Sequence, residues 1–124
     1  MKGRLKQIHP VLPVRNVSES ISYYTDKLGF TLAFKDAVDS PRYAGVKRDA
    51  IEIHLQWHDA NDWINGMDSC LLRIYAENID DLFNEYKSNS VFHEQTDLRD
   101  TAWGTREFGI YDEDKNGLIF YKDF

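Results

Sequence analysis

The chain repeats a helical sequence pattern at an interval of 62 residues. Four positions correspond at this interval, as the pairs Asn16/Asn78, Val17/Ile79, Ile21/Phe83 and Tyr24/Tyr86. The Asn at the start of each pattern is suited to cap a helix, and the apolar residues after it recur at helical spacing. In the first copy Leu28 extends the apolar face and Gly29 is placed to end the helix. The correspondence indicates an internal duplication, and therefore two modules of one kind.

Strand-like segments surround the two predicted helices in the same order. One strand precedes each helix, at residues 8–14 and 70–76. Three strands follow each helix, at residues 30–35, 42–47 and 50–57 in the first half and at 91–95, 105–111 and 118–122 in the second. Arg48 and Asp49 are expected to form a two-residue hairpin turn. Both halves therefore have the order βαβββ.

These patterns predict an α+β fold in a single domain spanning residues 1–124. We expect module one at about residues 7–57, a linker rich in Asp, Asn and Gly at about 58–68, and module two at about 69–124. One βαβββ module leaves a sheet face and two strand edges exposed, so it should pair with a second copy. Two modules would form curved mixed sheets, eight strands in all, around a groove with the helices outside. The strand order does not follow from the pattern.

The C-terminal segment is predicted to form a hairpin that begins at an aromatic residue. Apolar residues alternate with period two on both sides of an Asp/Asn/Gly-rich turn at 112–117, namely Phe108, Ile110, Leu118 and Phe120. Trp103 stands at the mouth of this hairpin, beside Gly104, which leaves one face of the indole uncovered. This tryptophan is either buried in the core or a stacking platform for a ligand, and both interpretations stay open.

The charge and composition exclude several classes of function. The chain has 15 Lys and Arg against 21 Asp and Glu, a net charge of −6, which disfavours nucleic acid and favours a cationic small molecule. No apolar run is long enough to span a membrane, and the N-terminus lacks the apolar core of a signal peptide. Cys70 is the single cysteine and forms no internal disulfide. We therefore expect a cytoplasmic protein with no membrane partner.

Four segments resemble the vicinal-oxygen-chelate superfamily of glyoxalases, ring-cleaving dioxygenases and antibiotic-resistance proteins. They are residues 10–17, 24–30, 43–49 and 103–108. Leu28-Gly29-Phe30 is shared across the superfamily, whereas the Trp-Gly-x-Arg-Glu-Phe segment is more characteristic of the bleomycin resistance proteins.

The resemblance implies a homodimer in which module one of each chain pairs with module two of the other. Each of two grooves would then sequester a bleomycin-type glycopeptide without catalysis, stacking its flat part between aromatic side chains. By position, those aromatics are Phe34 and Trp103, with Tyr43 also on the groove side. Glu52 is expected to attract a cationic ligand there.

The resemblance also bears on a metal site. Metal-dependent members carry four ligands, one on the first and one on the last strand of each module. His9 and Glu52 match the two positions of module one. In module two the corresponding positions fall at Cys70 or Leu71 and near Tyr121, which do not complete the set. We therefore expect no cofactor and no tightly held metal, with His9 and Glu52 as weak candidates.

Other side chains complete the set of candidates. His54 alternates with Glu52 along one strand, so both lie on one face and both are candidates to contact a bound ligand, but no third partner completes a catalytic triad. Trp57 and Trp63 flank the linker and are expected to line a groove end or fill a dimer interface. Two alternatives to antibiotic sequestration stay open. One is a metal-dependent glyoxalase- or dioxygenase-like enzyme using His9 and Glu52, and the other is a protein of the same fold that binds another aromatic small molecule.

Overall fold

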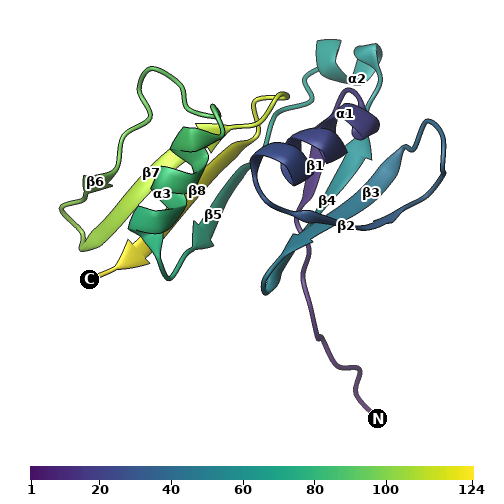
Figure 1. Cartoon of the computed structure of the whole chain (residues 1–124). Coiled ribbons are helices and arrows are strands. Elements are labelled where there is room, and N and C mark those ends of the chain that lie inside the picture. Colours follow the sequence, from purple (N-terminus) through teal and green to yellow (C-terminus); the bar gives the residue numbers. More distant parts are fainter.

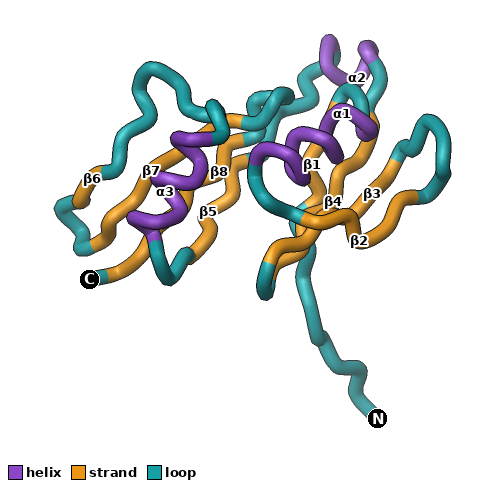
Figure 2. The backbone as a smooth tube through the Cα atoms, in the orientation of Figure 1, coloured by secondary structure: helices purple, strands orange, loops and turns teal.

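The computed structural model describes residues 1–124 and contains two four-stranded mixed sheets (Figures 1 and 2). The strand order is β1-β4-β3-β2 in the first sheet and β5-β8-β7-β6 in the second. The pairs β1–β4 and β5–β8 are parallel, and all other pairs are antiparallel. The two sheets therefore have the same topology, as the sequence repeat indicates.

The predicted α+β fold class is confirmed, with two sheets in place of one continuous sheet. The first sheet consists of β1 (Val11–Val14), β2 (Thr31–Lys35), β3 (Tyr43–Arg48) and β4 (Ile51–Trp57). The second consists of β5 (Leu71–Tyr75), β6 (Arg99–Asp100), β7 (Thr105–Tyr111) and β8 (Gly117–Asp123). No ladder joins β1 to β5, and neither sheet closes into a barrel.

A helix covers the same face of each sheet. Helix α1 (Val17–Ser22) continues into a π-helical turn (Tyr23–Lys27), and in Figure 1 it lies in front of the first sheet, as α3 (Ile79–Ser88) lies in front of the second. The side chain of Asn16 caps α1 by accepting a 3.0 Å hydrogen bond from the backbone N–H of Glu19. Gly29 follows with φ +76°, which ends the helix as predicted. None of the helices has both the length and the apolar character that a membrane-spanning helix needs.

One hydrophobic core joins the two halves. It comprises 17 buried residues drawn from both sheets and both main helices. Tyr24 of the first half and Tyr86 of the second are both almost fully buried in it, and their positions are equivalent in the repeat. Tyr86 also donates a hydrogen bond of 2.8 Å to the backbone oxygen of Leu28 in the other half. The helix-covered faces of the sheets are therefore packed, whereas their opposite faces remain open.

The structure differs from the prediction in three loops. Residues 91–95 form no strand: Val91 is buried and Phe92 packs against Phe83 and Phe108, whereas the three polar residues that follow are exposed in the loop. The short strand β6 comes later, at Arg99–Asp100. The β3–β4 turn is formed by Asp49 and Ala50, one residue after the expected position, with Asp49 at φ +51°.

The third difference is a short helix in the segment expected to be a linker. Helix α2 (Ala60–Ile64) lies within residues 58–68. Asp59 caps it, since its carboxylate accepts a 2.9 Å hydrogen bond from the backbone N–H of Asp62.

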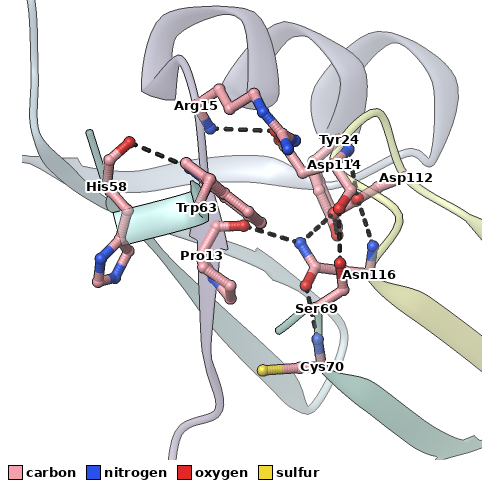
Figure 3. Close-up of polar contacts among 10 residues, drawn as sticks. All are labelled: Pro13, Arg15, Tyr24, His58, Trp63, Ser69, Cys70, Asp112, Asp114 and Asn116. Atoms are coloured by element: carbon pink, nitrogen blue, oxygen red, sulfur yellow. Dashed lines mark hydrogen bonds and ion pairs between the residues drawn. The ribbon is translucent and has the colours of Figure 1, made fainter. Parts of the chain in front are cut away.

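The turn between β7 and β8 anchors the second sheet to the first half of the chain (Figure 3). Buried Asp112 accepts hydrogen bonds from the hydroxyl of Tyr24, from the backbone N–H groups of Asp114 and Asn116, and from the Asn116 amide. The Asn116 amide also donates to the backbone oxygen of Pro13 and accepts from the N–H of Cys70. Burial raises the pKa of Asp112, although these donors act in the opposite direction. The acidic segment is thus a structural turn that links β1 to β5.

Candidate ligand-binding site

The open face of the first sheet brings together three of the titratable candidates. Val11 pairs with His54 in the parallel β1–β4 ladder, and two residues earlier His9 lies beside Glu52. Because side chains alternate along a strand, Glu52 and His54 point to the same face, away from the buried residues of β4. The three side chains are partly exposed and have candidate ligand atoms within 4.8 Å of one another.

Two aromatic side chains continue this face towards β2. Phe34 lies over Gly45, so closely that a Cβ atom at Gly45 would meet its ring at 2.4 Å. Its ring contacts His54 edge to face, with centroids 5.2 Å apart, and it is stacked with Tyr43 at 6.1 Å. A β-bulge between Leu32 and Phe34 shifts the pairing of β2 with β3, so that Phe34 lies opposite Gly45. With 41% of Phe34 exposed, the sheet presents an aromatic surface to solvent.

His54 is the centre of the polar contacts on this face. Its Nε2 lies 2.7 Å from Oε2 of Glu52, and its Nδ1 lies 2.7 Å from the hydroxyl of Tyr43. The imidazole of His9 stacks on that of His54, with ring centroids 4.7 Å apart. The hydrogen bond from His54 lowers the pKa of Glu52, and the nearby His9 acts in the same direction. The face therefore combines a carboxylate anion with flat aromatic rings.

The open face of the second sheet carries different chemistry. Glu107 is nearly buried, and its Oε2 accepts hydrogen bonds from Arg73 at 3.0 Å and from the hydroxyl of Thr105 at 2.9 Å. The guanidinium of Arg73 also lies 4.1 Å from the ring centroid of Tyr121. Burial raises the pKa of Glu107, but the bonds from Arg73 and Thr105 outweigh it and the net pKa is lowered.

A cavity of about 730 Å³ lies on the second sheet and has Glu107 in its lining. It lies beneath the segment from His93 to Asp97, and Glu107, Gly109 and Tyr111 of β7 form part of its lining. Sequence reasoning did not select Arg73 or Glu107 as site residues. The sequence signal was Arg73 between Leu72 and Ile74, because alternation along a strand places Arg73 on the face opposite those two apolar residues, and the structure has it on the open face.

Trp103 lies apart from both of these groups. It belongs to the loop between β6 and β7, and 69% of its surface is exposed, so it is not buried in the core. Gly104 has φ +91°, and a Cβ atom there would contact nothing within 4 Å. The indole is therefore accessible, and the stacking interpretation is the one that this exposure favours. Figure 1 shows this loop at the far end of the second sheet, away from β2 and β3.

The remaining tryptophans do not join the aromatic surface. Trp57 faces the core side of β4, where it packs against the hydrophobic cluster, and the guanidinium of Arg42 lies 4.6 Å from its ring centroid. Trp63 of α2 lies against Arg15, at 3.9 Å, and donates a hydrogen bond from its indole to the backbone oxygen of His58 (Figure 3). Arg15 in turn pairs with Asp114 at 3.3 Å. Trp63 thus supports the junction between the two halves.

Of the module-two positions that correspond to metal ligands, Leu71 has no ligating group and Tyr121 has a neutral phenol, and only Cys70 has a side chain that ligates metals. Leu71 is exposed on β5, and Tyr121 on β8 packs edge to face against Tyr75. Cys70 is partly buried, with its Sγ 3.8 Å from the backbone oxygen of Val11. Of these side chains, none belongs to the group of His9, Glu52 and His54 that has the spacing of a metal site.

A cleft of about 600 Å³ connects the two sheets near the start of β1. His9 and Glu52 line it on one side, and Arg73 and Tyr75 line it on the other. A ligand in this cleft would therefore meet both a carboxylate and a guanidinium. This cleft and the open faces of the two βαβββ modules are the candidate site for a small molecule.

Comparison with known proteins places the chain in a family. Residues 6–120 match the sequence model of the Glyoxalase/Bleomycin resistance protein/Dioxygenase superfamily, and the chain belongs to this superfamily. A bleomycin resistance protein of Geobacillus stearothermophilus is 33% identical over 129 aligned positions, which cover 91% of this chain and 93% of that protein. A bleomycin resistance protein of Staphylococcus aureus matches to the same extent.

Solved structures share the fold. The bleomycin-binding protein of Streptomyces verticillus, complexed with copper(II)-bleomycin, aligns with a TM-score of 0.77 and 24% identity, covering 96% of this chain and 97% of that one. A second bleomycin-binding protein complexed with bleomycin aligns with a TM-score of 0.75 and 21% identity, covering 97% of this chain and 100% of that one. At these identities the likeness establishes the fold alone.

Proposed function

We propose that the protein sequesters a bleomycin-type glycopeptide without converting it chemically. The relatives that are 33% identical over most of the chain are bleomycin resistance proteins, which supports this ligand class. The observation that carries the proposal is the accessible aromatic surface of Phe34 and Tyr43, together with the exposed indole of Trp103. Flat heteroaromatic groups gain about 0.5–1.5 kcal/mol per stacked ring beyond the burial of area.

The separation of the two aromatic platforms supports a site shared between two copies of the chain. Phe34 belongs to β2 of the first sheet, whereas Trp103 belongs to the β6–β7 loop at the far end of the second (Figure 1). One chain therefore does not sandwich a planar ligand between them. In a homodimer with module one of each chain facing module two of its partner, the two platforms would meet across each groove.

Charge supports a cationic ligand in that groove. The chain has a net charge of −6, and Glu52 contributes a partly exposed carboxylate beside the aromatic rings. Glu107 forms an ion pair with Arg73, so its charge is neutralised and it attracts a cationic ligand less than Glu52 does. In the proposed dimer Glu52 is therefore the acidic group that attracts the ligand.

Calorimetric titration with metal-free bleomycin tests the proposal. Wild type should bind one molecule per chain, and Phe34→Ala and Trp103→Ala should each weaken binding at least about tenfold. Ile64→Ala is the control, because Ile64 is an exposed apolar residue of α2 outside both open faces. If wild type does not bind bleomycin, the ligand assignment is wrong, and other flat aromatic molecules become the candidates.

Mixing the two variants tests whether the site is shared. Each heterodimer of Phe34→Ala and Trp103→Ala has one groove with both aromatics intact and one groove with neither. After joint refolding of equal amounts, about one quarter of the grooves should bind with wild-type affinity. If each site lies within one chain, the mixture would recover no tight binding. A monomeric mass by light scattering would contradict the shared site as well.

A further inference from the structure

The two modules differ in the length of the turn between their last two strands. Residues 112–116 join β7 to β8, whereas Asp49 and Ala50 alone join β3 to β4. Because the two sheets have the same strand order, these turns are equivalent. The turn of module one is therefore shorter than its counterpart by three residues, two against five.

The longer turn fills the junction between the modules on its side. Asp112 accepts a hydrogen bond of 2.8 Å from the hydroxyl of Tyr24, and Asp114 accepts one of 3.0 Å from the backbone N–H of Arg15 (Figure 3). Asp112, Asp114 and Asn116 are all buried, although they belong to a turn. Their side chains therefore occupy the space beside β1 and the helix that follows it.

The shorter turn leaves the equivalent junction open. A cavity of about 680 Å³ lies there, lined by Asp49 and Ala50 of the turn and by residues 74–78 at the end of β5, with α3 as a further wall. Tyr86 also lines it and is the counterpart of Tyr24 in the sequence repeat. Its hydroxyl donates to a backbone oxygen of module one, 2.8 Å away, and not to a turn residue. The cavity is therefore the counterpart of the space that the longer turn fills.

The cavity exposes a part of the hydrophobic core. Ile51, Ile74 and Leu82 pack against the core but are only partly buried, and all three line the cavity. The buried side chains of Tyr86 and Phe120 contribute to the lining as well. An apolar group placed there would remove this surface from water, which is favourable. The volume lies within the range of roughly 300–1,000 Å³ that is usual for small-molecule sites.

The charged side chains of the lining favour a cation. They are the four carboxylates of Asp49, Glu77, Asp81 and Glu85 and the single guanidinium of Arg48, which gives a net charge of −3. Arg48 and Glu85 compensate each other through two hydrogen bonds of 2.8 and 2.9 Å. Glu77 and Asp81 are exposed and form no ion pair within the chain. The lining would therefore attract an ammonium group and repel an anion.

We propose that this cavity binds a small amphiphilic amine. Its apolar part covers Ile74 and Leu82, in the place that corresponds to the longer turn of the other half. Its ammonium group lies near Glu77 and Asp81 at the rim. The cavity shares Ile51 and Ile74 with the cleft of about 600 Å³, but only the cavity reaches α3. The site therefore rests neither on bleomycin binding nor on a dimer groove.

Titration with 2-phenylethylamine at neutral pH tests the site, because this probe carries one ammonium group on an apolar body. The NMR signals of the methyl groups of Ile51, Ile74 and Leu82 should shift and saturate with one molecule per chain. The neutral analogue 2-phenylethanol should bind at least about fivefold more weakly, since it lacks the charge. Absence of saturable shifts at these methyl groups would overturn the proposal, and equal affinity for the amine and the alcohol would overturn the choice of a cation.

A double variant at the rim tests the role of the carboxylates. Glu77→Gln with Asp81→Asn removes two charges and keeps the shape of both side chains, so the amine should bind at least about fivefold more weakly while affinity for the alcohol stays the same. The matched control is Glu94→Gln with Asp97→Asn, which changes the net charge equally in the exposed loop before β6. An equal loss of amine affinity in both double variants would mean that only the net charge acts, and would overturn the site.

Filling the cavity tests its location. Ala50 is exposed and lines the cavity, so Ala50→Trp should put an indole in the place of the ligand and abolish the methyl shifts. The matched control is Ala60→Trp, at an exposed position that begins α2. Phe34→Ala should bind the amine as wild type does, because Phe34 lies on the open face of the first sheet. Unchanged binding by Ala50→Trp, or loss of binding in Phe34→Ala, would place the amine elsewhere and contradict the proposal.

Discussion

Phe34 lies flat against Gly45 on the neighbouring strand, with no room between them for a methyl group. A Cβ atom at Gly45 would stand 2.4 Å from Cε1 of Phe34. The two residues are partners in the β2–β3 ladder, and Gly45 is also the partner of His54 on β4. The missing side chain thus allows the Phe34 ring to cross β3 and reach His54, so Gly45 shapes the aromatic surface without contributing an atom to it.

Gly45→Ala should displace the Phe34 ring and weaken ligand binding as much as Phe34→Ala does. The free energy of unfolding should fall by about 1 kcal/mol, the smallest loss that overpacking usually causes, because the partly exposed ring of Phe34 can turn outward. The measurements are bleomycin titration and chemical denaturation of the same protein. Gly3→Ala is the control, since Gly3 lies before β1, outside both open faces, and a Cβ atom there meets nothing within 4 Å. Wild-type binding by Gly45→Ala would argue against an ordered role for Phe34.

Trp103→Ala should separate binding from stability. The indole is 69% exposed, so its removal should change the free energy of unfolding by less than about 1 kcal/mol. Ligand affinity should fall at least about tenfold, equivalent to about 1.4 kcal/mol. Denaturation and calorimetry on the same variant measure both quantities. A loss of about 3–5 kcal/mol in stability, with normal binding by the folded fraction, is the result expected of a core residue and would reject the stacking role.

The sequence alone predicted the features that depend on local patterns. The cap at Asn16, the end of the helix at Gly29 and the hairpin of β7 and β8 follow from residue type and spacing, and the structure has all three. The contact of Glu52 with His54 follows in part, because residues two apart on a strand share a face.

Features that depend on long-range packing were not predictable in this way. Trp57 was expected to line a groove end or fill a dimer interface from its place beside the linker. The alternation of Ile53, Leu55 and Trp57 along β4 instead puts its side chain on the core side of the sheet. The segment 91–95 has only a short, weak strand signal, and its two apolar residues, Val91 and Phe92, pack against the core from a loop. The approach of His9 to Glu52 depends on the parallel register of β1 and β4, and strand order does not follow from periodicity.

Asn116→Ala should destabilise the junction between the two halves. The amide of Asn116 bridges Pro13, Cys70 and Asp112 while fully buried, so its removal leaves backbone groups on β1 and next to β5 without partners. We expect a loss of about 3 kcal/mol in the free energy of unfolding. The control is Asn84→Ala, an exposed asparagine of α3. Equal stability of the two variants would mean that the hydrogen bonds of Asn116 contribute little.

The ion pair of Glu107 with Arg73 should make stability depend on acidic pH. The pKa of Glu107 is lowered from its ordinary value of 4.5, because the hydrogen bonds from Arg73 and Thr105 outweigh the opposing effect of burial. A carboxyl group with a lowered pKa in the folded state stabilises the protein above its unfolded-state pKa. This contribution is lost as the pH falls from about 4.5 through the lower, folded-state pKa.

Denaturation of wild type and Glu107→Gln, measured from neutral pH down to about pH 3, tests this dependence. The difference in unfolding free energy between them should be constant at neutral pH and should shrink as the solution becomes acidic, since protonation removes the charge that the variant already lacks. Glu94→Gln is the control, because Glu94 is an exposed residue of the loop before β6 and makes no ion pair. A difference between wild type and Glu107→Gln that stays constant over the whole range would show that the charge of Glu107 does not stabilise the fold.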